Sequence, residues 1–235
     1  MPSHLAVRRT PDAGEGLFAT APIEEGHIVG FYTGEAFPEA AFDARRDAAA
    51  REPYALVVEP ASHVRVVLSP VSSSTGSLEA ELRQHPLAAA NEPRAGDRAN
   101  MLMVHLEVDP ATLTGAVRRS VRAALRDPGR VSQPTRVHLC VLVACRDVAA
   151  DEELTWHYGD AYAALRRQRG YDVGEPGWID ERRTADPYAL LRRWKAPVPA
   201  DAIVPSVSTK ETLERDPVGD GDEAACGSCR RTSWR

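Results

Sequence analysis

The sequence predicts a mainly β fold with short helices. In its first third, brief apolar or aromatic runs are bounded by glycine and proline, which is the pattern of short strands joined by turns. Residues 16–20 and 28–32 are two such runs, and residues 22–26 form the turn between them. The stretches with the apolar periodicity of a helix are short. We therefore expect small sheets with short helices between them.

The segments that follow alternate between helical and strand patterns. Residues 38–51 are rich in alanine and charged side chains, and they predict a helix. Residues 54–59 and 63–68 are two apolar runs separated by a proline-containing loop, so they predict a hairpin. Residues 78–85 predict a single short helix or turn.

Residues 109–136 interrupt the strand pattern and are interpreted as an insertion. Four apolar residues recur at every fourth position and would share one face of a helix: Leu113, Val117, Val121 and Leu125. Four arginines lie off that stripe: Arg118, Arg119, Arg122 and Arg126. Two interpretations stay open. The helix either packs on the domain with a solvated basic face, or contacts nucleic acid, an acidic partner or a membrane surface.

The last part of the chain changes character twice. Residues 136–143 return to a strand pattern, and residues 160–169 predict a helix. Residues 163–194 form a helical and aromatic C-terminal extension. Residues 195–235 are poor in apolar side chains and rich in proline, aspartate, threonine and serine. Such a composition does not bury enough surface to offset chain entropy, so we expect an extended or disordered tail from residue 195.

Composition and charge exclude several classes of protein. Of the 235 residues, 43% are hydrophobic and 27% are charged, which is an ordinary globular balance. The net charge of -5 argues against a protein that coats nucleic acid through its overall field. No apolar run approaches the roughly 18 residues of a membrane span. Residues 1–9 lack the apolar stretch of a secretory signal. We expect an intracellular protein, in the nucleus or the cytoplasm, that does not enter a membrane.

The cysteines and histidines predict no metal site. Cys140 and Cys145 are five positions apart, and an odd separation on a strand points side chains to opposite faces, so we expect buried, inert thiols. Cys226 and Cys229 have metal-ligand spacing, but a structural zinc takes four ligands and no second pair is present. The remaining candidates are scattered without ligand spacing and are assigned no chemistry: His4, His27, His63, His85, His105 and His138.

Four short motifs carry residues suited to binding and catalysis. Residues 14–16 (Gly-Glu-Gly) predict a tight loop in which the backbone approaches a ligand, because glycine lacks a Cβ. Residues 32–35 (Tyr-Thr-Gly-Glu) end a strand with an aromatic side chain and a bend. Asn91 and Asn100 each supply a donor and an acceptor. The fourth motif is residues 153–159 (Glu-Leu-Thr-Trp-His-Tyr-Gly).

In this order the four motifs resemble the SET domain, a family of S-adenosylmethionine-dependent protein lysine methyltransferases. The resemblance covers about residues 4–162. It implies a SET-domain fold of small curved sheets with a knot-like centre, in which the segments around Asn91 and Tyr158 meet. It also implies that residues 4–162 form one domain, with the insertion at about 109–136.

The resemblance further implies the roles of individual residues. Tyr158 falls on the catalytic tyrosine of the family. Five positions would bind the cofactor S-adenosylmethionine: Gly14, Glu15, Gly16, Asn91 and Asn100. Aromatic residues would line the channel for the substrate lysine: Tyr32, Tyr54 and Trp156. Three later aromatic residues either anchor the extension to the core or wall this channel: Tyr162, Tyr171 and Trp178.

The asparagine-rich segment departs from the family pattern. Most members carry Asn-His-Ser-Cys followed closely by Pro-Asn, whereas here Glu92 and Pro93 follow Asn91. No cysteine lies between Asn91 and Asn100. In many members such a cysteine completes a zinc site with a later cysteine cluster, so that zinc site is expected to be absent.

Three functions therefore stay open. The leading one is a protein lysine N-methyltransferase acting on a histone tail or on another lysine-bearing protein, with chromatin as the family default. The alternative is a catalytically inactive SET-like scaffold that binds protein partners and has lost the cofactor. The third, a nucleic-acid-binding module built on the arginine-rich helix, is disfavoured by the acidic total charge. Retention of cofactor binding separates the first two. The oligomeric state is not predicted.

Overall fold

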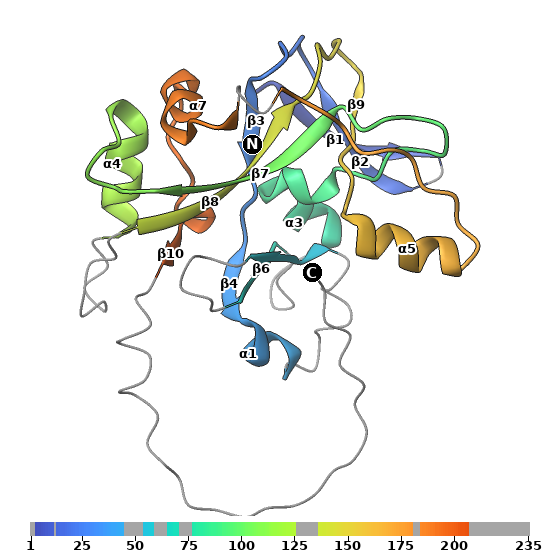
Figure 1. Cartoon of the computed structure of the whole chain (residues 1–235), viewed down its shortest axis with the longest axis horizontal. Helices are drawn as coiled ribbons and strands as arrows, with labels where there is room; N and C mark the ends of the chain where they lie inside the picture. Colours follow the sequence, from blue (N-terminus) through green and yellow to red (C-terminus); the bar gives the residue numbers. More distant parts are fainter. Residues whose placement is uncertain are drawn as a thin grey trace, which may run out of the picture.

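Three small antiparallel sheets with short helices around them make up the described part of the chain (Figure 1). The mainly β fold class is therefore confirmed. The computed structural model describes these ranges: residues 3–11, 13–44, 54–58, 65–70, 77–125, 136–180 and 184–206.

The first sheet joins the N-terminal hairpin to the late motif. β1 (Leu5–Thr10) and β2 (Gly14–Ala19) pair antiparallel. Residues 14–16, which were expected to form a tight loop, instead begin β2 and pair with residues 8–10. β9 (Glu153–Leu154) adds to β2, with Leu17 opposite Leu154. Both leucines are fully buried, and a slip of one residue would turn them away from the core, so their burial sets this register. The first motif, residues 14–16, and the fourth motif are thus neighbours.

The second sheet has β8 (Arg136–Ala144) at its centre. β7 (Met101–Val108) pairs along one edge of β8. β3 (Ile28–Phe31) and β10 (Val204–Ser206) pair with different parts of β8 and share its other edge. Every residue of β8 after Arg136 is buried, because both faces of the strand are covered.

The third sheet lies at the bottom of Figure 1. β4 (Glu35–Pro38) and β5 (Leu56–Val58) pair antiparallel with β6 (Val66–Ser69), which lies between them. β5 and β6 are the predicted hairpin, whose loop lies outside the described residues. The helix predicted after β4 is present as α1 (Glu39–Asp43), and its predicted later part also lies outside them.

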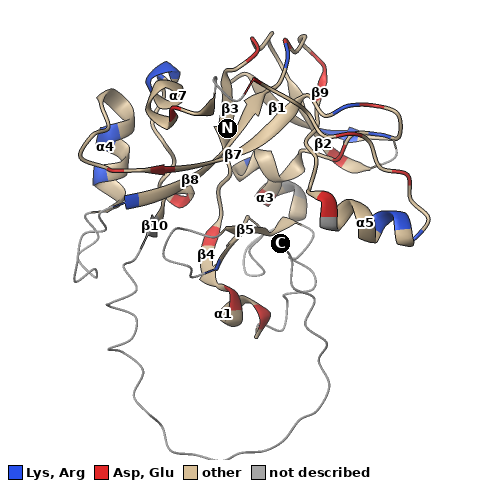
Figure 2. Cartoon of the chain, in the orientation of Figure 1, with Lys and Arg blue, Asp and Glu red and all other residues tan. Residues whose placement is uncertain are grey.

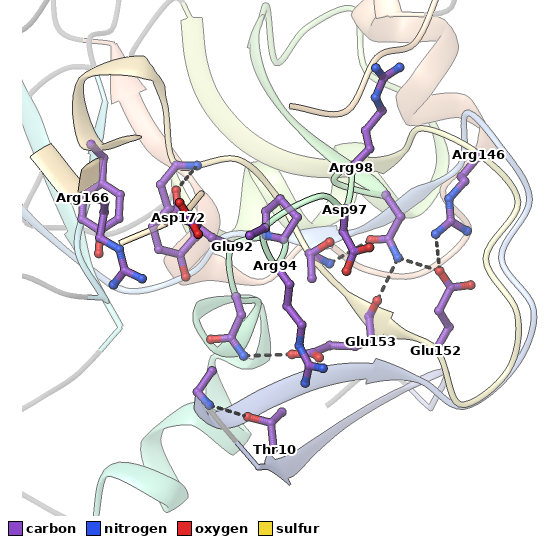
Figure 3. Close-up of a pocket in the computed structure, with 18 of the residues that line it drawn as sticks. Thr10, Glu92, Arg94, Asp97, Arg98, Arg146, Glu152, Glu153, Arg166 and Asp172 are labelled. Carbon is purple, nitrogen blue, oxygen red and sulfur yellow. Dashed lines mark hydrogen bonds and ion pairs between the residues drawn. The ribbon is translucent and has the colours of Figure 1, made fainter. Parts of the chain in front are cut away.

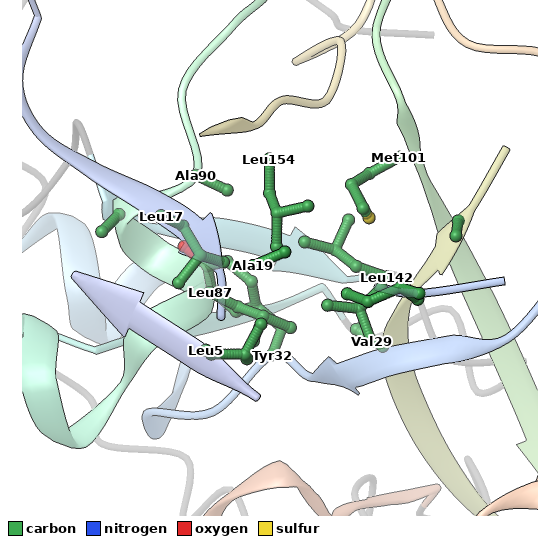
Figure 4. Close-up of a cluster of buried hydrophobic side chains, with 14 of the residues drawn as sticks. Leu5, Leu17, Ala19, Val29, Tyr32, Leu87, Ala90, Met101, Leu142 and Leu154 are labelled. Carbon is green, nitrogen blue, oxygen red and sulfur yellow. The ribbon is translucent and has the colours of Figure 1, made fainter. Parts of the chain in front are cut away.

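β8 separates two hydrophobic clusters. On one face it packs with α4 (Gly115–Ala124) and α7 (Pro187–Arg193). On the other face Leu142 belongs to a cluster with Met101 and Leu154 (Figure 4). The second cluster lies directly beneath the motif segments and therefore supports the candidate site.

α4 carries the apolar stripe that the sequence predicts. All four stripe positions are buried: Leu113, Val117, Val121 and Leu125. Arg119 and Arg122 are exposed. Figure 2 shows basic residues on α4, α7 and the end of α5 (Asp160–Gln168), and acidic residues on α1. The structure favours the interpretation of a packed helix with a solvated basic face.

Short helices lead into and out of the candidate site. α3 (Leu78–Gln84) begins at Ser77, whose side chain accepts a hydrogen bond from Ala80 N at 3.3 Å. η2 (Pro86–Ala89) then leads into the asparagine-rich segment, and α5 follows the fourth motif. Among the described residues, every helix is too short or too polar to cross a lipid bilayer.

The boundary of the predicted tail is corrected by the structure. Residues 195–206 belong to the fold, because η3 (Ala200–Ala202) contacts α4 and β10 pairs with β8. Val198 and Ile203 are buried there. A few buried apolar residues are enough to hold this segment in the fold, because the edge of β8 is already available for pairing. The rest of the predicted tail, with Cys226 and Cys229, lies outside the described residues.

Candidate functional site

The two ends of the asparagine-rich segment pair with the fourth motif at the centre of the fold. Thr155 and Trp156 lie between the two ends of the loop 91–101. Trp156 N donates to Asn91 O at 3.0 Å, and Met101 N donates to Thr155 O at 3.0 Å. One segment thus passes between the two ends of another, which is the knot-like arrangement that the resemblance implies.

Asn100 holds this arrangement from inside. Its side chain is 2% exposed, and Nδ2 donates to Glu153 O at 2.8 Å and to Glu152 Oε1 at 3.0 Å. Its Oδ1 accepts from Thr155 N at 2.8 Å. An amide nitrogen has two donors, so Asn100 has no side-chain donor left for a ligand. Its cofactor contact stays a prediction, and Oδ1 or the main chain would have to make it.

Asn91 connects residues 14–16 of β2 to β9. Its Nδ2 donates to Glu15 O at 3.1 Å and to Glu153 Oε1 at 3.0 Å. In the part of the chain that the structure describes, no residue donates to Asn91 Oδ1. This acceptor is therefore available to a bound molecule.

Gly16 has no room for a side chain. An added Cβ would lie 2.6 Å from Thr10 Cγ2 and 2.8 Å from Glu153 Oε1. Gly16→Ala is therefore expected to lower the free energy of unfolding by about 1–3 kcal/mol, measured by urea denaturation. Thr10→Ser removes the methyl group and keeps the hydroxyl that donates to Gly14 O at 3.2 Å. Added to Gly16→Ala, it should recover part of the loss, and no recovery would contradict this packing account.

A cavity of about 990 Å³ opens beside these residues (Figure 3). This volume is at the upper end of the roughly 300–1,000 Å³ of small-molecule sites. The lining includes five residues that the sequence analysis considered for the site: Tyr54, Asn91, Asn100, Tyr158 and Tyr162. The predicted residues 14–16, Tyr32 and Trp156 do not line it. Thr10 and Ala13, which precede residues 14–16 in the same hairpin, do.

The lining carries charges of both signs, as Figure 3 shows. Its arginines and carboxylates are Arg94, Arg98, Arg146, Arg166, Glu92, Asp97, Glu152, Glu153 and Asp172. Arg146 pairs with Glu152, and Arg98 pairs with Glu175. Arg166 Nε is buried and has no hydrogen-bond partner among the described residues. The guanidinium of Arg166 and the carboxylates of the lining suit a ligand that carries both an acidic and a basic group.

Tyr158 lines the cavity with a firmly held hydroxyl. Its Oη donates to Ala90 O at 2.8 Å, and its main-chain N donates to Glu92 Oε1 at 3.4 Å. Burial, and to a lesser degree the nearby Glu92 carboxyl, raises the pKa of the Tyr158 hydroxyl well above its ordinary value. The group is therefore neutral at physiological pH. Because its proton is directed at Ala90 O, its lone pairs remain able to accept an N–H from a substrate.

Aromatic rings surround Tyr158. The ring centroid lies 4.9 Å from that of Trp156 and 5.3 Å from that of Tyr162. Tyr54 lines the same cavity, whereas Tyr32 is buried behind it and donates to Tyr54 O at 2.5 Å. The hydroxyl of Tyr32 therefore supports the wall. Rings in this arrangement suit the aliphatic stem and the cation of a lysine.

Two of the three later aromatic residues do not anchor the C-terminal extension. Tyr171 is 53% exposed and Trp178 is 70% exposed. Tyr171 instead lies against the Arg166 guanidinium, whose carbon is 4.3 Å from the ring centroid. The anchoring interpretation is wrong for these two residues, and Tyr162 is the one that contacts Tyr158.

Glu92 stands where the family pattern has histidine. Partial burial raises the pKa of its carboxyl, and the Tyr158 N–H together with Arg166, His157 and Arg167 opposes that shift. A carboxyl with a raised folded-state pKa stabilises the fold below its unfolded pKa, and this contribution is lost as pH rises through the folded pKa. Glu92→Gln should therefore gain stability relative to the native chain as pH rises above about 4.5. Urea unfolding across pH measures this, and parallel pH profiles would contradict it.

Comparison with known protein families shows to which family the chain belongs. The family model of the SET domain matches residues 14–159, which is more than half of the chain and includes all four motifs. The chain belongs to the SET domain family. Members of this family are typically S-adenosylmethionine-dependent lysine methyltransferases that act on proteins. No curated protein matches the chain.

The sequence analysis missed part of the SET-domain site. Thr10, Arg146 and Arg166 line the cavity without standing in any of the four motifs. The position of Arg166 has a readable signal, since it lies on the helix that directly follows Tyr158. Thr10 reaches the cavity through the β1–β2 hairpin, and Arg146 is held beside it by its ion pair with Glu152. No local pattern marks either residue.

Proposed function

We propose that the chain is a protein lysine N-methyltransferase with Tyr158 as its catalytic residue and S-adenosylmethionine as its cofactor. The observation that carries this proposal is the junction of two family motifs at one cavity. There the neutral Tyr158 hydroxyl, flanked by Trp156 and Tyr162, stands beside a lining with charges of both signs. The domain proposed for this activity spans residues 4–162, with the insertion at about 109–136.

The residues present fit the cofactor. Its amino-acid end carries a carboxylate and an ammonium group, and the cavity lining includes Arg166 and several carboxylates. Asn91 Oδ1 is an available acceptor, and the hydrogen bond from Asn91 Nδ2 to Glu15 O ties residues 14–16 to the cavity lining. We propose that these groups, together with Asn100, hold the cofactor. When bound, S-adenosylmethionine supplies an electrophilic methyl group on a positively charged sulfur.

The protein's own task is to prepare the substrate amine. A lysine ammonium has no lone pair, and neutralising it at pH 7 requires roughly 5 kcal/mol because its pKa is near 10.4. The rings of Tyr158 and Tyr162 line the cavity, and Trp156 packs against Tyr158 from outside the lining. Together they exclude water from the amine and so lower that pKa. The Tyr158 oxygen then accepts an N–H of the neutral amine and orients its lone pair. Alignment and desolvation suffice, and no side chain acts as a nucleophile.

The proposed substrate is a lysine of a histone tail or of another protein, in the nucleus or the cytoplasm. The rival function is a scaffold that keeps the SET fold without the cofactor. The hydrogen bonds of Asn91 and Asn100 within the fold would serve a scaffold equally well. The available Asn91 Oδ1 favours the enzyme, because a scaffold gains nothing from an acceptor left open to the cavity.

A label-transfer assay tests the proposal. The full chain is incubated with methyl-tritiated S-adenosylmethionine and a panel of histones and other lysine-bearing proteins, and hydrolysed protein is analysed for methyllysine. We expect label in lysine, reduced in Asn91→Ala through a higher KM for the cofactor. Arg119→Ala on α4, an exposed position away from the cavity, serves as the matched control. A folded chain that labels no lysine in any protein would favour the scaffold.

A further inference from the structure

A second cluster of ligand-type side chains lies on the central sheet. His105 of β7 and two residues of β8, His138 and Cys140, each place one ligand atom within 4.8 Å of the other two. His105 Nδ1 is 3.1 Å from His138 Nε2 and 3.5 Å from Cys140 Sγ. None of the three lines the cavity. The cluster is therefore separate from the proposed methyltransferase site.

The sheet brings these side chains together. His105 stands opposite Cys140 in the β7–β8 ladder. His138 and Cys140 are two positions apart on one strand, so they point to the same face. Cys140 is fully buried, His138 is 6% exposed, and His105 is exposed. Because β8 is paired on both edges, the two buried groups are held rigidly.

We propose that His105, His138 and Cys140 bind a zinc ion, with water in the fourth position. A tetrahedral site with zinc–nitrogen distances of about 2.0–2.1 Å and a zinc–sulfur distance of about 2.3 Å separates neighbouring ligand atoms by about 3.3–3.6 Å. The two distances from His105 Nδ1 are already close to these values. The exposure of His105 gives the ion and the water a path from solvent.

The chemistry of the three groups selects the metal. Two imidazoles and a thiolate form a nitrogen and sulfur set that suits zinc, whereas calcium and magnesium prefer oxygen ligands. A neutral imidazole offers a lone pair on one ring nitrogen, and His105 Nδ1 and His138 Nε2 are the ring atoms that face each other. Zinc binds the thiolate form of cysteine. The thiol proton must therefore leave to solvent as the zinc–sulfur bond forms, one proton for each ion bound.

A metal at this position would brace the sheet behind the aromatic wall. Tyr32 N donates to Cys140 O at 2.8 Å, and the Tyr32 hydroxyl holds the main chain at Tyr54. The proposed zinc, held by three protein ligands, would tie β7 to β8 at the point from which Tyr32 supports the cavity, and it would take no part in methyl transfer.

Cobalt(II) spectroscopy tests the site directly. The full chain is prepared with Cys145→Ser, Cys226→Ser and Cys229→Ser, which leaves Cys140 as the sole thiol. One equivalent of cobalt is expected to give thiolate-to-cobalt charge-transfer absorption with the visible bands of a tetrahedral ion. Zinc should abolish both signals, and a pH indicator should record one proton released per zinc bound.

Two matched histidine variants test whether the cluster binds zinc or whether His105 and His138 only form a hydrogen bond with each other. His105→Ala removes an exposed ligand and should weaken zinc binding at least about tenfold, by analogy with the loss of outer-shell partners. It should also remove the rise in Tm that zinc gives the parent chain. His27→Ala is the control outside the cluster. Absence of the charge-transfer absorption in the folded parent, or equal zinc binding by both variants, would overturn the proposal.

Discussion

Tyr158→Phe is expected to slow methyl transfer to lysine by about 10²–10³-fold, the range seen when one positioned hydrogen-bonding group is removed from an active site. The substitution deletes the oxygen that accepts an N–H of the substrate amine and leaves the ring between Trp156 and Tyr162. Single-turnover transfer of tritium from labelled cofactor measures the rate. Cofactor affinity should stay close to that of the native chain, because the ring and the main chain remain in place.

The effect on rate must be separated from an effect on folding. Loss of the hydroxyl also leaves Ala90 O without its donor, at about 1–3 kcal/mol of stability. Tyr162→Phe is the matched control, since it removes the same atom from the neighbouring ring and no described residue bonds that hydroxyl. We expect Tyr162→Phe to keep most of the activity. Near-native rates in Tyr158→Phe, or equal losses in the two variants, would contradict the role of Tyr158.

Asn100→Ala is expected to cause the largest loss of stability, about 2–5 kcal/mol in urea unfolding. The variant loses three hydrogen bonds and leaves Thr155 N and Glu153 O without their side-chain partners, at about 1–3 kcal/mol for each buried group. Since these bonds hold the fourth motif between the ends of the loop 91–101, the position of Tyr158 should also change.

Arg98→Ala is the control for this loss of stability. Arg98 is close to Asn100 in sequence, but its ion pair with Glu175 is exposed on both sides. Exposed pairs contribute at most about 1 kcal/mol. The two variants should therefore differ clearly in their urea midpoints. Stabilities within about 1 kcal/mol of each other would show that Asn100 does not hold the centre of the fold.

The fold was predictable where local patterns are strong. The stripe from Leu113 to Leu125 repeats every four residues. Val117 and Val121 form the buried face of α4, and Leu113 and Leu125 are buried just beyond its two ends. β7 was missed because His105 and Glu107 break its apolar run, and its strand character comes from pairing with β8. β10 was missed for a related reason. Its short segment pairs with the part of the β8 edge that β3 leaves open, and the composition of the segment gives no sign that such a partner exists.

The candidate site was predictable through its motifs and not through its supporting contacts. Asn91 and Tyr158 stand in recognisable strings, and both line the cavity. Tyr32 was expected in the channel, but it follows directly after β3 and lies in the core cluster behind Tyr54. The cluster that we propose to bind zinc was missed because His105 joins it across the sheet. Its one readable signal is the alternation of His138 and Cys140 on a strand.

A calorimetric titration of S-adenosylmethionine into the full chain tests the central claim most directly, because every proposed role of the cavity depends on the cofactor being held there. The account predicts binding of one cofactor per chain, weakened in Asn91→Ala and retained in Tyr158→Phe. A chain shown to be folded by its cooperative urea transition that gives no binding heat at several temperatures, with and without lysine-bearing protein, would contradict the account and favour the scaffold.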